Sequence, residues 1–216
     1  MNEKTFYAII TVIIAVGGIG IGAVYYHTMS TSGGGKSVTG TEISVYHLNL
    51  MEIMDGNYNS SVGAQPIFYV IQNGHLQSSS NISVPSHVEI QLTITSYDMG
   101  NGSVDPKYLA VQGTSGDRVT LIDGMNASGT NTSSMWAQQV SSFSPSQVVH
   151  TFTILNGTSV LVNIPMVAGD TEIATLYLNN TGTFIWQCEV ACGTGASGWE
   201  GAMSTPGWME GSVSVH

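Results

Sequence analysis

The chain beyond residue 30 consists largely of short apolar or alternating runs separated by turn-forming residues. In residues 88–95 the apolar side chains recur at every second position, which is typical of a strand with one buried face. Further strand candidates lie at residues 67–71, 118–122, 148–154, 159–164, 171–178, 183–188 and 211–215. No segment after residue 30 keeps the 3.6-residue apolar period of a helix over three turns. The pattern predicts an all-β fold, built as an antiparallel sandwich or barrel.

Residues 6–26 contain no charged side chain. A helix needs about 20 apolar residues to cross a bilayer, so we expect residues 1–29 to form an N-terminal membrane anchor with a single transmembrane helix. A cleaved signal peptide is the alternative, although its apolar region is usually about 7–15 residues long. Lys4 favours a cytoplasmic N-terminus. N-x-S/T sequons between Asn59 and Asn179 accord with a C-terminal domain outside the cytoplasm.

The rest of the chain divides by composition. Residues 30–41 are rich in Ser, Thr and Gly, as in a linker. Residues 42–216 carry the strand candidates and form one predicted domain. Within it, residues 97–146 are rich in turn-forming residues, and we expect an insertion of the sandwich there and not a second domain.

Charged residues make up only 8% of the chain, with 4 Lys and Arg against 14 Asp and Glu. So few basic residues exclude nucleic-acid binding, which requires a basic surface. A surface of Ser, Thr, Asn and Gly suits a strongly acidic exterior, because few carboxylates there lose their charge as the pH falls. An ordinary glycosylated ectodomain is the alternative. No serine-hydrolase, zinc-protease or P-loop motif is present, so we name no catalytic residue.

Several residues that can bind a metal lie in the C-terminal third. His150 falls on the apolar face of its strand, where a histidine is often only a core residue. Cys188 ends another strand, and Cys192 follows four positions later. Met203 and Met209 precede the last strand. Imidazole, thiolate and thioether groups together select copper over magnesium or calcium.

Residues 148–215 resemble cupredoxins, and more closely the cupredoxin domain of subunit II of haem–copper terminal oxidases. The similarity lies in HTFTI, GTFIWQC and the ending M-x-G-x-V-x-V. In that subunit a C-x-x-x-C-G loop carries the two-copper CuA centre, and residues 188–193 have this spacing. The resemblance implies a Greek-key β-sandwich that binds one or two copper ions and transfers electrons. Its partners would be the membrane and haem–copper oxidase subunits or another redox protein.

The ligand loop departs from the family. Ala196 and Trp199 stand where the CuA loop has its histidine and methionine, and Glu189 lies one residue earlier than the family's glutamate. Judged from the M-x-G-x-V-x-V ending, Met209 falls where the ligand methionine is expected. No histidine lies between Cys188 and Met209, and His216 would have to fold back to reach the site.

Three hypotheses follow. In the first, His150, Cys188, Cys192 and either Met209 or Met203 hold copper and relay electrons, while any catalysis belongs to a partner oxidase. In the second, the domain is a copper-less subunit II, as in quinol oxidases, and the two cysteines are free or disulfide-linked. In the third, it is a non-redox surface or copper-storage module.

Overall fold

The computed structural model of the chain describes residues 44–100, 102–122 and 137–216. These residues belong to a compact unit that spans Ile43–His216. The predicted anchor at residues 1–29 and the linker at residues 30–41 lie outside the described residues. In the part of the chain that is described, no helix combines the length and apolar character needed to cross a membrane.

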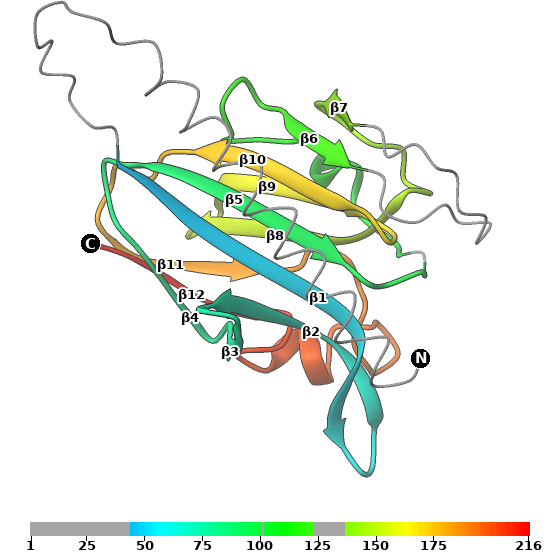
Figure 1. Ribbon diagram of the computed structural model, residues 1–216. Helices are drawn as coiled ribbons and strands as arrows, with labels where there is room; N and C mark the ends of the chain where they lie inside the picture. Colours follow the sequence, from blue (N-terminus) through cyan, green and yellow to red (C-terminus); the bar gives the residue numbers. More distant parts are fainter. Residues whose placement is uncertain (1–43, 101, 123–136) are drawn as a thin grey trace, which may run out of the picture. The chain divides into compact units, whose positions relative to one another are not determined.

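The described residues form two β-sheets (Figure 1). The strands of the first sheet are β1 (Val45–Asn59), β2 (Gly63–Gln72), β3 (His75–Ser78), β5 (Glu89–Ser96), β6 (Val119–Ile122), β7 (Ala137–Val140) and β10 (Thr171–Leu176). Those of the second are β4 (Asn81–Val84), β8 (Val148–Asn156), β9 (Ser159–Val167), β11 (Gly182–Gln187) and β12 (Glu210–Val215). The strand orders are β3-β2-β1-β5-β10-β6-β7 and β4-β12-β11-β8-β9. The 3-10 helices η1 (Pro106–Tyr108) and η2 (Gly201–Ser204) complete the unit.

The prediction of an all-β sandwich is confirmed, but the prediction that it is antiparallel is wrong. β1 runs parallel to β5, and β4 runs parallel to β12, so both sheets are mixed. Each parallel pair contains a strand that the sequence pattern did not reveal. In β1 the inward positions that begin with Leu48 and Leu50 continue with Glu52, which interrupts the apolar alternation.

Three aromatic side chains occupy the core between the sheets. Phe68 of β2 lies edge-on to Trp186 of β11 with ring centroids 5.3 Å apart, and Phe152 of β8 stacks on Trp186 at 5.6 Å. Nε1 of Trp186 donates to the carbonyl of Ser79 (2.8 Å), so the buried indole keeps a polar partner. A Cβ at Gly211 would lie 2.5 Å from this nitrogen, which accounts for the glycine. The cluster fixes β11 in the core.

The described parts of residues 97–146 pack on the sandwich. The backbone N–H of Gly102 donates to the carbonyl of Val148 (3.3 Å), and Gln112 exchanges two backbone hydrogen bonds with Asn163 of β9. The Asn163 side chain also donates to the carbonyls of Tyr108 and Ala110. The segment therefore contributes backbone contacts, and the strands β6 and β7, to the fold. Its boundaries as an insertion stay a prediction.

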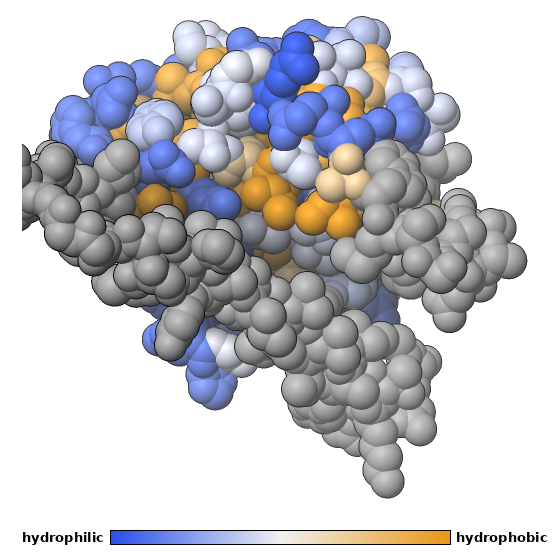
Figure 2. All heavy atoms as spheres, turned by 45° about the horizontal axis from the view of Figure 1, so that its top comes forward, coloured by the Kyte–Doolittle hydropathy of each residue, from blue (hydrophilic) through white to orange (hydrophobic). Residues whose placement is uncertain are grey.

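The surface is polar and nearly free of positive charge. Figure 2 shows hydrophilic and hydrophobic residues interspersed over the face that is drawn in colour. Among the described residues, Lys107 and Arg118 are the lysine and arginine side chains, and both are exposed. Lys107 lies 3.6 Å from Asp105. Carboxylates buried inside the sandwich must therefore find other partners.

Glu172 of β10 is one such buried carboxylate. Its Oε1 accepts the backbone N–H of Val167 (2.8 Å), whereas no hydrogen bond to its Oε2 is formed by the described residues. Burial, together with the nearby charge of Asp170, raises the pKa of Glu172 from 4.5 to about 8. The folded domain thus favours the protonated, neutral form of this side chain.

We predict that Glu172→Gln flattens the dependence of stability on pH. A raised carboxyl pKa gives stability that is complete below the unfolded value of 4.5 and is lost as the pH rises through about 8. Because one pKa unit corresponds to about 1.4 kcal/mol, the wild-type protein should lose several kcal/mol over this window. Urea unfolding at pH 4.5 and pH 8 measures the loss, and the exposed Asp55→Asn serves as a control. Equal losses in wild type and Glu172→Gln would contradict the prediction.

Candidate metal centre

Four side chains from separate segments meet at one end of the sandwich. His150 lies near the start of β8, Cys188 follows the end of β11, Cys192 lies on the next loop, and Met203 belongs to η2. β8 and β11 are neighbouring strands, with Thr153 opposite Gln187, so the strand pairing itself brings His150 and Cys188 to the same region. The predicted inward alternation that ends at Cys188 is confirmed.

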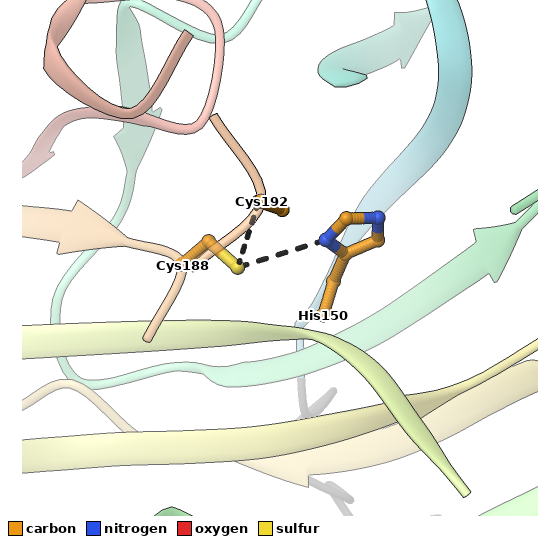
Figure 3. A group of neighbouring side chains, drawn as sticks. All are labelled: His150, Cys188 and Cys192. Atoms are coloured by element: carbon orange, nitrogen blue, oxygen red, sulfur yellow. Dashed lines mark hydrogen bonds between the residues drawn. The ribbon is translucent and has the colours of Figure 1, made fainter. Parts of the chain in front are cut away.

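The sulfur and nitrogen atoms of this group are close together (Figure 3). Sγ of Cys188 lies 3.7 Å from Nδ1 of His150 and 3.9 Å from Sγ of Cys192. Sγ of Cys192 lies 3.2 Å from Sδ of Met203. His150 and Cys188 are 1% and 0% exposed, and both cysteines are free thiols. The four residues thus present two thiols, an imidazole and a thioether to a common space.

These separations fit a shared metal ion. Two sulfur atoms bound to one metal at about 2.3 Å in a tetrahedral arrangement lie roughly 3.8 Å apart. The separation of 3.9 Å between the Cys188 and Cys192 sulfur atoms matches this value. The ligand atoms of His150, Cys188 and Cys192 all lie within 4.8 Å of one another. The donor set therefore fits a soft metal, and copper in particular.

The two cysteine thiols differ in pKa. Burial alone would raise the pKa of Cys188, but hydrogen bonds from Cys192 and His150 and the positive charge of His150 hold it well below its usual range. The backbone N–H groups of Val190 (3.4 Å) and Thr151 (3.5 Å) also donate to its sulfur. The hydrogen bond to Cys188, together with burial, raises the pKa of Cys192. Cys188 is therefore the thiolate of the pair, and Cys192 donates to it.

The imidazole has a second set of partners that sequence reasoning missed. Nε2 of His150 lies 2.9 Å from Oδ2 of Asp98 and 3.3 Å from Oε1 of Glu52. Burial would lower the pKa of His150, but the hydrogen bonds to Asp98 and Cys188 and the nearby Glu52 carboxyl group raise it well above its usual range. Burial would likewise raise the pKa of Asp98, and the hydrogen bonds from His150 and Gly100 hold it below its usual value. In the metal-free protein, a protonated His150 thus lies between the carboxylate of Asp98 and the thiolate of Cys188.

In the structure Glu52 stands at an inward position of β1 after Leu48 and Leu50, and a buried carboxylate needs a partner. The sequence pattern did not reveal this strand, so Glu52 was not predicted. Asp98 was not predicted either, because it follows β5 in a segment without periodicity. Only the parallel pairing of β1 with β5, which sets Glu52 opposite Ser96, brings the two carboxylates together.

The two candidate methionines contact different parts of the group. Sδ of Met203 lies 3.2 Å from Sγ of Cys192. The carbonyl of Met209 accepts the N–H of Cys188 (2.8 Å). Both methionine side chains are buried in the same hydrophobic core as Cys188. Both stay predicted ligands, and the sulfur contact with Cys192 favours Met203.

The other histidines of the described residues do not join the group. His216 follows β12 and lies beside β4. Its backbone N–H donates to the carbonyl of Val84 (3.2 Å), and its ring nitrogen Nδ1 lies 3.4 Å from Ser83 Oγ. His47, His75 and His87 are exposed. Within the described part of the chain, the groups that include a histidine and could hold a metal ion are His150 with Cys188 and Cys192, and His150 with Glu52 and Asp98.

No known family model matches the sequence, and no curated protein matches it. Among solved structures, a chain of a haem–copper terminal oxidase dimer is 12% identical, with 99% of each chain covered and a TM-score of 0.37. Rusticyanin from Thiobacillus ferrooxidans is 10% identical, with 80% of each chain covered and a TM-score of 0.35. A multicopper oxidase is 12% identical over 79% of this chain and 44% of its own, with a TM-score of 0.36. This chain thus spans less than half of that oxidase, and none of these values assigns it to a family.

We predict that Met203→Leu and Met209→Leu have different effects. A Leu for Met exchange in a core usually costs less than about 1.5 kcal/mol, so both variants should fold. Met203→Leu should weaken copper binding and change the visible absorption of the copper-loaded protein, because it removes the sulfur next to Cys192. Met209→Leu should leave both unchanged. The reverse pattern, measured by copper titration and absorption spectroscopy, would make Met209 the thioether ligand.

Proposed function

We propose that this chain is a membrane-anchored, extracytoplasmic copper protein that transfers electrons, with a cupredoxin-like Greek-key domain similar to that of terminal oxidase subunit II. The observation that carries the proposal is the buried group of His150 Nδ1, the two cysteine sulfur atoms and Met203 Sδ. The sequence resemblance agrees with it, since the same C-x-x-x-C-G spacing holds copper in that family.

The chemistry of the donors favours copper over other metals. Zinc sites use thiolate and imidazole ligands, but a thioether beside them is characteristic of copper sites. When bound, copper would exchange one electron between Cu(I) and Cu(II). His150, Cys188, Cys192 and Met203 would hold the ion, and the burial of His150, Cys188 and Met203 would keep water away from it. The donor set is compatible with one or two copper ions.

The chain itself would be a carrier. Its electron acceptor would be haem–copper oxidase subunits or another redox protein, and any catalysis would take place in that partner. The anchor predicted at residues 1–29 would keep the domain at the outer surface of the membrane. Such a location brings a one-electron carrier close to a membrane-bound oxidase.

A copper-less scaffold is the second candidate, favoured by the same two cysteines. They lie four residues apart as free thiols with their sulfur atoms 3.9 Å apart, and an oxidising exterior favours disulfide formation. The domain would then serve as a structural subunit, as in the subunit II of quinol oxidases. A non-redox surface or copper-storage module remains the third candidate.

Copper binding by the full chain tests the proposal directly. The protein is purified in detergent under reducing conditions, freed of metal and titrated with copper. We expect stoichiometric copper and an intense thiolate-to-copper absorption band. His150→Ala should abolish the band. His216→Ala should leave it intact, because His216 lies beside β4 and not in the group around His150. Colourless protein that binds no copper and forms a Cys188–Cys192 disulfide in air would favour the scaffold.

We predict that Cys192→Ser abolishes the copper centre but leaves the domain folded. Cys192 is only half-buried and forms no disulfide, so its replacement should cost little more than about 1 kcal/mol. Copper content and thermal unfolding, measured on the same sample, separate the two effects. A variant that keeps the wild-type absorption band would remove Cys192 from the ligand set.

A further inference from the structure

The carboxylates beyond His150 are arranged for more than structural support. We propose that Glu52 and Asp98 are positioning residues of the metal centre, which hold His150 through Nε2 so that Nδ1 faces Cys188, and whose charge favours the oxidised form of the bound copper. This inference rests on the proposed function, because it requires copper at His150 Nδ1. It assigns a role to two residues that lie outside the predicted ligand set.

In both carboxylates, the oxygen that does not face His150 accepts a hydrogen bond from another residue. Oε2 of Glu52 accepts the hydroxyl of Ser96 (2.8 Å), and Oδ1 of Asp98 accepts the backbone N–H of Gly100 (2.6 Å). The backbone carbonyl of Glu52 also accepts the N–H of Tyr97 (2.9 Å). Glu52 and Asp98 are 0% and 8% exposed. The atoms that face His150 therefore have little freedom to move.

This arrangement determines which nitrogen carries the proton. An ionised carboxylate can only accept a hydrogen bond, so the nitrogen that faces two carboxylates must be the donor. Nε2 of His150 is that nitrogen, at 2.9 and 3.3 Å from its partners. The lone pair of the neutral imidazole then lies on Nδ1, which points at Cys188 Sγ. The carboxylates thus select the tautomer and ring orientation that a metal beside Cys188 requires.

The charge of the pair bears on the redox state of the metal. Among the described residues, Lys107 is paired with Asp105 and Arg118 is exposed, so His150 is the cation that contacts Glu52 and Asp98. Once copper takes the place of the proton on Nδ1, the metal becomes the main positive charge of this buried group. Negative charge at low dielectric stabilises Cu(II) more than Cu(I). The carboxylates should therefore lower the reduction potential.

The test compares charge-removing variants of the copper-loaded full chain. Glu52→Gln and Asp98→Asn keep the side-chain shape and remove one negative charge each. Asp55→Asn is the control, since Asp55 is exposed and belongs to neither group of possible metal ligands. Copper affinity is measured by competition with a chelator, and the reduction potential by titration with ascorbate or dithionite while the thiolate-to-copper band is followed.

We expect Glu52→Gln and Asp98→Asn to raise the reduction potential, and Asp98→Asn to weaken copper binding by about 10- to 100-fold. Asp55→Asn should change neither quantity. Wild-type potential and affinity in both charge variants would overturn the inference while leaving the proposed function intact. A second bound metal that is lost only in Glu52→Gln and Asp98→Asn would also overturn it, because the carboxylates would then be ligands themselves.

A measurement on the wild-type protein covers the case in which these variants fail to fold. Loading with Cu(I) gives a diamagnetic sample, in which ¹⁵N NMR of the histidines reports which ring nitrogen carries hydrogen. We expect His150 to show Nε2–H with Nδ1 bound to copper. The opposite assignment would overturn the inference. A wild-type chain that binds no copper would overturn the proposed function, and the inference with it.

Discussion

The imidazole of His150 joins the two halves of the site, and the rest of the arrangement depends on it. Its Nδ1 side faces the sulfur of Cys188, and its Nε2 side faces Glu52 and Asp98. Buried polar groups are costly unless they are paired, so each of these four side chains needs its neighbours. Glu52 lies in β1 and Asp98 follows β5 of the seven-stranded sheet, whereas His150 lies in β8 and Cys188 follows β11 of the five-stranded one. The contacts among these four side chains therefore fix how the two sheets meet at the end of the sandwich that holds the candidate metal centre.

The aromatic core next to these four side chains explains why their positions are so well defined. Phe152, two residues after His150, stacks on Trp186, two residues before Cys188. Both side chains are anchored in the same aromatic cluster, so β8 and β11 have little freedom to slide or tilt. Proteins place catalytic and metal-binding groups on such rigid elements, because a ligand set loses affinity when its members can move apart. Here the aromatic core sets the positions of the imidazole and the first thiol.

The sequence predicted the strands that follow simple periodicity and the inward positions of His150 and Cys188. Alternation revealed β5, β8, β11 and β12, and the Cys188–Cys192 spacing revealed the loop. It did not reveal β1 or β4, whose apolar patterns are interrupted or short, and so the two parallel pairings were missed. Asp98 joins the site only through the pairing of β1 with β5, a contact between distant segments that no local pattern encodes. The contact of Met203 with Cys192 likewise required the geometry of the loop, because the family pattern favoured Met209.

The central claim is that one imidazole and two thiols of this chain bind copper together. X-ray absorption spectroscopy at the copper edge of the loaded full chain tests it most directly, since it identifies the atoms bound to the metal. We expect short copper–sulfur distances from two thiolates, together with the scattering signature of an imidazole. A copper ion surrounded by oxygen and nitrogen atoms alone would contradict it.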